Sequence, residues 1–432
     1  MIINFTIQNF GSIKDKQVLS FEATKTDHLE NTYVIHMGGM RLLKLALIYG
    51  PNASGKTTIL KALDFLRSII LEPNEKKTDE LDFEPFLFDS ETPDKTSKLT
   101  IEFIHEDIKY SYEVEFIKKA IVNEELYFYN PKKANLYKRK TDLSNQYTDI
   151  TFGSKIKIDN TFEKTLEANT LWNNTVLGGY LKTNIDFKEL KQVIEWFKTH
   201  LNPMIAPRTN LYMYVTEKIS EGKINRRDVI EILQKADFHI SDIVIQEKED
   251  KFPPHFIEFL RKEFANSKRI KELPDENGKI KSINLTFEHT VNKKKYPLDF
   301  GLESEGTKRY YGFAGILSEA LRKSTVLPID ELESSLHPDL YEHLLLTFLM
   351  NAKQSQIIAT THHREILNNK DIFRRDAIWF TDKNNNCATE LYSLADFDSS
   401  VIRDSTNVLN AYKSGKLGAT PNPNDTYIEL NE

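Results

Sequence analysis

The sequence predicts an α/β fold in which a mixed sheet carrying a glycine-rich loop is joined to an antiparallel β lobe and interrupted by a helical insertion. The apolar run Leu45–Tyr49 ends in the glycine-rich loop 50–57, and a helical pattern with apolar residues every three or four positions follows. Residues 97–130 alternate between apolar and polar, as half-buried antiparallel strands do. Two more short apolar runs, 326–329 and 356–360, have helical patterns between and after them, which indicates an α/β core.

The remaining segments complete this picture. The first 25 residues alternate like two strands around a turn, and a C-terminal hairpin is expected from strands at 377–380 and 388–391. Between residues 162 and 267 the pattern is mostly that of amphipathic helices. We expect one α/β domain, called the head, that is formed by two separate parts of the chain. Its N-terminal half is 1–155, and its C-terminal half, with hairpin and tail, is 281–432. A helical insertion lobe at 156–280 lies between them in the sequence.

Composition places the chain among ordinary globular proteins. It has 432 residues, enough for two or three domain-sized cores, and 40% are hydrophobic and 28% charged. The net charge of -6 gives no overall nucleic-acid footprint. The basic runs 138–140 and 293–295 are interpreted as solvated surface, with DNA contact as the less favoured alternative. The first residues hold no basic run ahead of a long apolar stretch, which argues against a secretory leader, and the longest apolar runs are too short to span a bilayer. Cys387 is the only cysteine, so the expected home is a reducing cytoplasm.

The loop 50–57 fits the pattern G-x-x-x-x-G-K-[ST]. Its glycines allow backbone N–H groups to turn inward, and the following helix points its positive end at a bound phosphate. Lys56 is expected to face the β- and γ-phosphates of a nucleotide, and the Thr57 hydroxyl to coordinate Mg²⁺. The alternative, a chance glycine-rich turn, does not explain why strand, loop and helix are all in register.

Two acids, Asp330 and Glu331, end the apolar run that starts at Val326. In phosphate-loop ATPases an acid at this place holds Mg²⁺, so Asp330 is the predicted metal ligand and Glu331 the predicted base for the attacking water. A strand end with solvated acids is the alternative. Pro328 is unexpected in a central strand because proline cannot donate to the ladder.

Two further segments carry candidate residues. Ser304 and Gly306 open a strong helix, where backbone N–H groups could bind a second phosphate, although an N-cap serine is the simpler interpretation. The polar run Thr360-Thr361-His362-His363 follows a core strand, where α/β sheets bind ligands, and a histidine there could contact the γ-phosphate.

The order of these motifs resembles the head of ABC ATPases, and more closely the ABC-like ATPases related to OLD (overcoming lysogenization defect) proteins and to bacterial abortive-infection ATPases. The segments that carry the resemblance are residues 7–13, 48–57, 330–338, 361–362 and the tail 410–421. The likeness covers the head at both ends of the chain and is weak in the middle.

The resemblance implies roles by position. It implies that Asp330 supports Mg²⁺, that Glu331 activates water and that His362 contacts the γ-phosphate. Ser304 and Gly306 would reach the ATP of an opposing subunit, and residues 333–335 would lie in the loop that crosses this dimer interface. The residues implied to wrap the ATP phosphates are Gly50, Pro51, Asn52, Ala53, Ser54, Gly55, Lys56, Thr57 and Thr58.

Some family features are not expected here. The segment Glu84-Pro85-Phe86 occupies the region where such heads place a glutamine that touches Mg²⁺, but it holds no glutamine. Long coiled-coil arms are excluded by the short, proline-interrupted middle. Glu390, Asp396 and Asp398 imitate the acidic site of a Toprim nuclease, but about 70 residues after His362 are too few for that domain, so a solvated turn is the preferred interpretation.

The functional prediction is an ATPase that binds ATP and Mg²⁺ and assembles as a homodimer or larger homo-oligomer through composite ATP sites. It would act in the cytoplasm as sensor or motor subunit of a bacterial anti-phage system with a separate effector protein, a nuclease or toxin. The defence role depends on family analogy. The alternatives are an SMC-like DNA-maintenance ATPase that clamps DNA and a nucleotide-locked scaffold.

Overall fold

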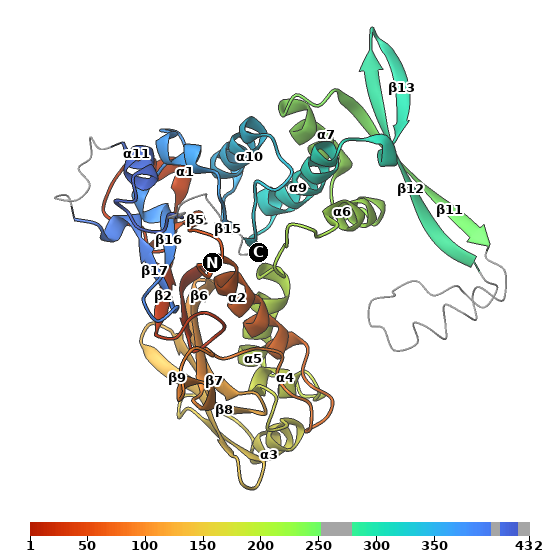
Figure 1. Cartoon of the computed structure of the whole chain (residues 1–432). Helices are drawn as coiled ribbons and strands as arrows, with labels where there is room; N and C mark the ends of the chain where they lie inside the picture. Colours follow the sequence, from red (N-terminus) through yellow and green to blue (C-terminus); the bar gives the residue numbers. More distant parts are fainter. Residues whose placement is uncertain (252–278, 399–406, 422–432) are drawn as a thin grey trace, which may run out of the picture. The chain divides into compact units, whose positions relative to one another are not determined.

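A computed structural model describes residues 1–251, 279–398 and 407–421 (Figure 1). The chain folds as two compact units. The larger unit consists of residues 1–209, 320–334 and 341–432, and the smaller unit of residues 210–319 and 335–340. The three-segment division at 155/156 and 280/281 stays a prediction.

The core of the larger unit is a five-stranded sheet. Its strands, in spatial order, are β14 (Val326–Ile329), β15 (Gln356–Thr360), β5 (Leu45–Tyr49), β16 (Ile378–Lys383) and β17 (Thr389–Ser393). The first four are parallel, and β17 runs antiparallel to β16. All five residues of β5 are buried, as expected of a parallel strand between two neighbours in a covered sheet. The three predicted core strands, the C-terminal hairpin and the α/β fold class are confirmed.

Pro328 is tolerated because β14 lies at the edge of this sheet. The outer edge of β14 is covered by the segment 201–205, whose Ile205 N–H donates to the carbonyl oxygen of Pro328 at 2.9 Å. The same segment contacts the helix α2 (Lys56–Leu71), since Arg67 Nε donates to Leu201 O at 2.9 Å. The expectation that Pro328 lies in a central strand was therefore wrong, because β14 is an edge strand. Proline lacks an N–H group, but its carbonyl oxygen still accepts a hydrogen bond.

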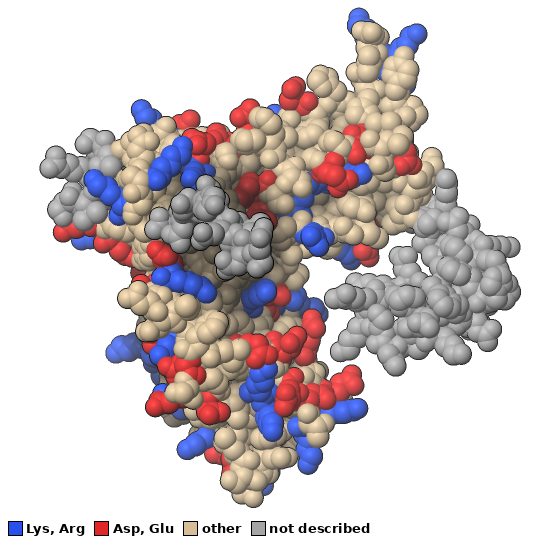
Figure 2. Space-filling model, viewed as in Figure 1, with Lys and Arg blue, Asp and Glu red and all other residues tan. Residues whose placement is uncertain are grey.

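A second sheet of the larger unit has seven antiparallel strands. In spatial order they are β10 (Tyr147–Phe152), β9 (Lys133–Asp142), β8 (Ala120–Tyr129), β7 (Ile108–Ile117), β6 (Ser97–His105), β1 (Ile2–Gln8) and β2 (Gln17–Ser20). The alternation predicted over 97–130 is confirmed: its apolar side is buried, with Phe103 stacked on Trp196 at 4.0 Å between ring centroids. The opposite side pairs its charges, for example Lys98 with Glu113 at 2.5 Å, and Figure 2 shows both signs interspersed over this lobe.

Several shorter elements complete the larger unit. Its helices are α1 (Glu30–Tyr33), α2 (Lys56–Leu71), α3 (Asn160–Asn169), α4 (Val176–Tyr180), α5 (Lys188–Glu195), the π-helical η2 (Trp196–His200), the main part of α10 (Pro338–Asn351) and α11 (Val408–Lys413). Its 3₁₀ turns are η1 (Thr92–Asp94), η4 (Arg364–Asn368), η5 (Arg375–Ala377) and η6 (Leu394–Asp396). Strands β3 (Val34–Met37) and β4 (Met40–Leu43) form a hairpin.

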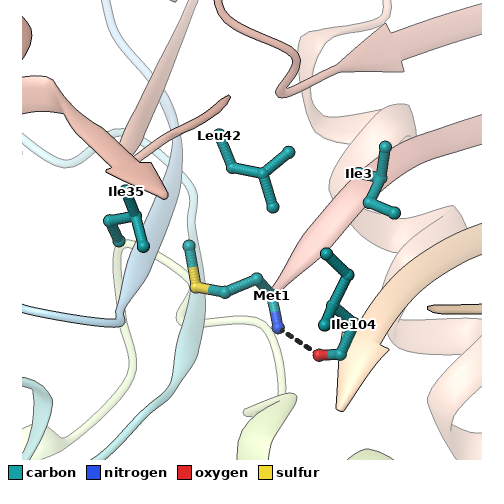
Figure 3. Close-up of a cluster of buried hydrophobic side chains, with 5 residues drawn as sticks. All are labelled: Met1, Ile3, Ile35, Leu42 and Ile104. Atoms are coloured by element: carbon teal, nitrogen blue, oxygen red, sulfur yellow. Dashed lines mark hydrogen bonds between the residues drawn. The ribbon is translucent and has the colours of Figure 1, made fainter. Parts of the chain in front are cut away.

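The hairpin β3–β4 is attached to the seven-stranded sheet by an apolar cluster. Figure 3 shows the five side chains of this cluster, Met1, Ile3, Ile35, Leu42 and Ile104, gathered between β1, the hairpin and the end of β6. All five are buried, and the Met1 amino group donates to Ile104 O at 2.9 Å.

The smaller unit contains α6 (Leu211–Ser220), α7 (Arg226–Lys235), the 3₁₀ turn η3 (Phe300–Leu302) and most of α9 (Glu305–Arg322). Its sheet has the order β11 (Ile240–Lys251), β12 (Lys279–Val291) and β13 (Lys294–Asp299). The β12–β13 hairpin extends away from the helices of this unit (Figure 1). Two glycines let α6 and α9 pack closely: a Cβ on Gly312 would lie 2.5 Å from Leu211 Cβ, and one on Gly315 would lie 2.3 Å from Val215 Cγ2.

The expectation of helix through residue 267 is wrong over Ile240–Lys251, which form β11, and residues 252–267 of that stretch lie outside the described residues. The reason is a β-bulge between Ile240 and Asp242, where the register with β12 shifts. The bulge brings Ile240 and Ile243, three positions apart, both into the core. Because a spacing of three is typical of a helix, the apolar pattern does not predict this strand.

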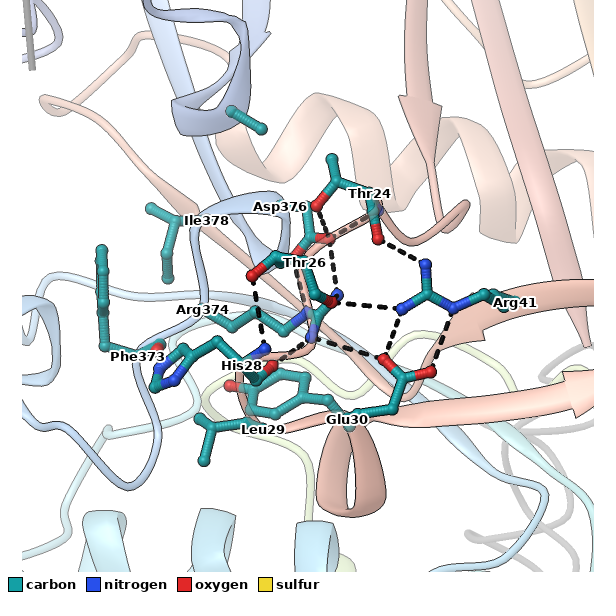
Figure 4. Close-up of polar contacts among 12 residues, drawn as sticks. Thr24, Thr26, His28, Leu29, Glu30, Arg41, Phe373, Arg374, Asp376 and Ile378 are labelled. Carbon is teal, nitrogen blue, oxygen red and sulfur yellow. Dashed lines mark hydrogen bonds and ion pairs between the residues drawn. The ribbon is translucent and has the colours of Figure 1, made fainter. Parts of the chain in front are cut away.

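The segment before β16 contains a buried ion pair, and both of its side chains also contact the N-terminal region (Figure 4). Arg374, with 0% exposure, donates to both carboxylate oxygens of Asp376 at 2.8 and 3.0 Å. Asp376 also accepts from the backbone N–H and the hydroxyl of Thr24, at 2.8 and 2.7 Å. Next to it, Arg41 pairs with Glu30 at 2.5 Å.

We expect Asp376→Ala to lower the free energy of unfolding by about 3–5 kcal/mol, because the buried Arg374 loses its hydrogen-bonded carboxylate and, among the described residues, keeps only the Glu30 carboxylate, at 3.9 Å. Glu91→Ala is the matched control: it breaks the exposed Lys95–Glu91 pair and should cost at most about 0.5 kcal/mol. Thermal and urea unfolding of both variants provide the measurement. Equal losses in the two variants would contradict the importance assigned to the buried pair.

Candidate nucleotide site

The glycine-rich loop connects the buried strand β5 to α2. Asn52 and Ala53 lie exposed at its tip, and α2 begins at Lys56. Gly55 has φ 102°, and a Cβ there would lie 2.2 Å from the hydroxyl of Thr389, so only glycine fits. The first-turn N–H groups of a helix have no intrahelical acceptors, which makes this end of α2 suited to an anion.

Hydroxyl groups from other segments of the chain hold the glycine-rich loop in place. Thr389 Oγ1 lies 2.8 Å from both Ser12 Oγ and the carbonyl oxygen of Ser54. The Ser54 and Thr381 hydroxyls are 2.6 Å apart, and those of Ser12 and Thr58 are 3.0 Å apart. These contacts fix the position of the loop. The sequence interpretation placed Ser54 and Thr58 in the loop but missed Ser12, Thr381 and Thr389, which come from distant segments.

Lys56 is buried, and its ammonium group is held by the loop itself. Nζ donates to the carbonyl oxygens of Gly50 at 2.9 Å and Pro51 at 3.0 Å. Burial lowers the pKa of Lys56, and the carboxylates that follow β14 act in the opposite direction. A cation kept in a desolvated loop is ready to bind an anion.

The Asp330 carboxylate is the point at which three strands of the core sheet meet the loop. The Thr57 hydroxyl lies 3.0 and 3.1 Å from its two oxygens, and the Thr360 hydroxyl donates to Oδ1 at 2.7 Å. The Asp330 N–H donates to Ile205 O at 2.8 Å. The structure therefore brings the two residues predicted to hold Mg²⁺ into direct contact, although they are 273 positions apart.

Thr360 also fixes the second acid. Its hydroxyl accepts the Glu331 N–H at 2.8 Å, and Glu331 has φ 48°, a left-handed conformation that is uncommon for a residue with a side chain. The Glu331 side chain is exposed, which is compatible with its predicted role as a base for water. The polar end of β15 was noticed in the sequence, but the fully buried Thr360 was not given a role there.

The oxygens around Asp330 fit a magnesium ion. Mg²⁺ prefers hard oxygen ligands and is bound through one or two carboxylates together with substrate phosphates and water. Thr57 and Asp330 supply a hydroxyl and a carboxylate beside the loop. Among the described residues, His, Cys, Asp and Glu side chains do not form a group of three or more that could hold a metal without a substrate.

The two histidines after β15 differ. The His362 side chain is exposed, and its backbone N–H donates to Glu333 Oε1 at 2.6 Å. Desolvation is the main cause that lowers the pKa of the His362 imidazole, and the charge of Lys56 acts in the same direction. His363 instead packs edge-on against the Tyr341 ring, with centroids 5.2 Å apart. Only His362 is thus available to a ligand near Lys56, and its contact with a phosphate stays a prediction.

Ser304 and Gly306 lie in the smaller unit. The Ser304 hydroxyl accepts the Thr307 N–H at 3.0 Å, which is the contact of an N-cap residue at the start of α9. A Cβ on Gly306 would lie 3.2 Å from Ser335 O in the same unit. The N-cap interpretation describes the contacts within one chain, and a role toward a partner's nucleotide stays a prediction.

The segments without an assigned role have structural contacts. Glu84, which lies in the region where related heads place a glutamine, forms an ion pair with Lys118 at 2.5 Å. Asp396 closes a capping box with Ser393 at the start of η6. Glu390 accepts from Asn384 at 3.2 Å in the C-terminal hairpin.

A family model described as an AAA domain, putative AbiEii toxin, type IV TA system, matches residues 45–169 and 216–368, which together exceed half of the chain. The chain belongs to this AAA family. A search of the curated proteins returns no match. In the described part of the chain, no helix has the length and hydropathy needed to cross a bilayer.

Solved structures of SMC heads are similar to this AAA protein at low identity. The SMC head bound to the C-winged-helix domain of ScpA has a TM-score of 0.43 and 13% identity, covering 91% of this chain and 97% of that chain. The Thermotoga maritima SMC head has a TM-score of 0.37, with 13% identity and coverage of 91% and 98%. A Pyrococcus furiosus SMC head with an extended coiled coil, bound to the C-terminal domain of ScpA, has a TM-score of 0.40, with 13% identity and coverage of 91% and 96%.

We predict that Lys56→Ala weakens ATP binding by roughly 10- to 100-fold, because a charge-assisted hydrogen bond to phosphate is lost. Lys61→Ala, which removes an exposed lysine from the same helix, should leave the dissociation constant unchanged. Titration with a fluorescent ATP analogue measures both. Normal affinity in the Lys56 variant would disprove the assignment of the loop.

Proposed function

We propose that this AAA protein hydrolyses ATP to ADP and phosphate in the manner of ABC-like ATPases. The observation that carries the proposal is the contact between the Thr57 hydroxyl and the Asp330 carboxylate beside Lys56. The loop residues bind the phosphates, and Lys56 balances their charge. A magnesium ion held by Thr57 and Asp330 would neutralise charge on the β- and γ-phosphates.

The chemical step assigned to the protein is proton abstraction. Glu331 accepts a proton from a water molecule whose oxygen bonds to the γ-phosphorus, while the bond from that phosphorus to the β–γ bridging oxygen breaks and ADP leaves. Thr360 supports this role, since it holds the backbone of Glu331 and the carboxylate of Asp330 at the same time. His362 is the proposed contact to the γ-phosphate.

We further propose that the site is completed by a second copy of the chain. Ser304 and Gly306 open α9, whose N-terminus favours an anion. The nucleotide of their own chain already has the N-terminus of α2. Two copies related by a two-fold axis would each lend α9 to the other's ATP.

The biological role we propose is that of a sensor or motor subunit in bacterial anti-phage defence, related to OLD and abortive-infection ATPases and acting in the cytoplasm with a separate nuclease or toxin. The description of the matching family, which names a putative toxin of a type IV toxin–antitoxin system, supports this direction. Phage challenge of cells carrying the gene, with and without its neighbouring gene, tests it. DNA-stimulated hydrolysis without protection from phage would favour an SMC-like clamp instead.

We expect Glu331→Gln to keep ATP affinity and to slow hydrolysis by roughly 10²–10⁴-fold, the usual contribution of a positioned general base. Glu390→Gln, a matched change of an exposed acid in the C-terminal hairpin, should leave turnover within about twofold of wild type, since surface groups away from the site contribute little. Phosphate release under saturating ATP provides the measurement. Full activity of Glu331→Gln would show that the base lies elsewhere.

Composite sites predict that two variants, each defective in hydrolysis alone, restore activity when mixed. In a Lys56→Ala and Gly306→Glu heterodimer, one site combines an intact loop with an intact α9 N-terminus, so turnover returns. The control is a chain carrying both changes, mixed with wild type: each heterodimer site then holds one lesion and stays inactive. Heterodimers that form but never hydrolyse ATP in the first mixture would rule out sharing of α9.

A further inference from the structure

Four hydrogen bonds join the turn after β14 to the end of β15 and to the segment that follows it. Three of them involve Thr360: its hydroxyl accepts from Glu331 N at 2.8 Å and donates to Asp330 Oδ1 at 2.7 Å, and its carbonyl accepts from Leu332 N at 3.2 Å. The fourth runs from His362 N to Glu333 Oε1 at 2.6 Å. It is the bond through which a carboxylate of the turn fixes the backbone of the histidine.

The surroundings of Glu333 make this bond a strong one. Its second oxygen, Oε2, is shielded from solvent and has no hydrogen-bond partner among the described residues. A shielded carboxylate costs free energy unless its charge is compensated, and a short charge-assisted bond is stronger than a neutral one. The charge of Glu333 also acts in the direction that raises the pKa of Lys56 and that of His362, so it lies close to the site.

The position of Glu333 is unsuited to proton abstraction. A general base must reach the attacking water, and the exposed neighbour Glu331 meets that condition. Glu333 Oε1 is already engaged by the His362 N–H, and Oε2 is enclosed. Glu333 therefore acts on His362 through the backbone N–H, while the His362 side chain is exposed.

We propose that Glu333 is a positioning residue for ATP hydrolysis: it holds the His362 main chain and thereby sets where the imidazole meets the γ-phosphate. This inference rests on the proposed function. A displacement of about 1 Å in a contacting group can cost on the order of 100-fold in rate, so a single backbone bond at this place is sufficient to matter.

The test compares Glu333→Ala, which removes the acceptor, with Glu333→Gln, which keeps an acceptor oxygen of the same reach. We expect Glu333→Ala to lower kcat by about 10- to 100-fold while the Kd for ATP stays within about threefold. Glu333→Gln should stay within about threefold of wild-type kcat, because a neutral amide oxygen still accepts the bond. His362→Ala should cost as much as Glu333→Ala, and the double variant no more than either, because the two residues act as one unit.

A second measurement does not depend on activity. In protein labelled with ¹⁵N-histidine, the short bond places the His362 amide proton downfield, and His362→Gln identifies the resonance. The resonance should keep its position in Glu333→Gln and move upfield in Glu333→Ala.

Three results would overturn the proposal: wild-type kcat in Glu333→Ala, an equal loss in the Gln and Ala variants, or additive losses in the double variant. Absence of turnover in the wild type would instead disprove the proposed function. The amide resonance then decides about Glu333 by itself, since an unchanged position in Glu333→Ala overturns the contact and an upfield shift sustains it.

Discussion

The Asp330 carboxylate is held by two hydroxyls from different elements, Thr57 at the start of α2 and Thr360 at the end of β15. This arrangement requires that β14, β15 and β5 lie side by side and parallel, because only then do the carboxyl ends of all three strands meet at one edge of the sheet. The buried apolar residues of β5 and β15 supply the packing that keeps these ends in register. The site is thus a direct product of the strand order.

The residues with a chemical motif could be predicted from the sequence, and the structure brings Lys56, Thr57 and Asp330 together as the pattern requires. The supporting residues could not. Thr360, Ser12 and Thr389 act through single hydroxyls that come from segments far apart in the chain, and a lone serine or threonine carries no pattern of its own. Their roles become visible only when the strands are placed.

The fold shows the same division. The core strands and the helix α2 were predictable because their periods are regular, whereas β11 was not, because a bulge gives Ile240 and Ile243 a helical spacing. Pro328 was misjudged for another reason. The sequence does not reveal which strand lies at an edge, and a proline that disrupts a central strand is harmless where its carbonyl alone is needed.

The cover on β14 has a consequence for how the protein can be altered. The segment 201–205 pairs with the outer edge of β14 and continues directly into the smaller unit at Asn210. An uncovered edge strand is a template for pairing with other chains. A shortened protein in which the smaller unit is excised together with residues 201–205 would expose the edge of β14, the strand that leads into both acids, as a template for self-association. An excision of the smaller unit that begins at residue 210 would keep residues 201–205 on the edge of β14. Thr209 is therefore the natural boundary for a minimal head.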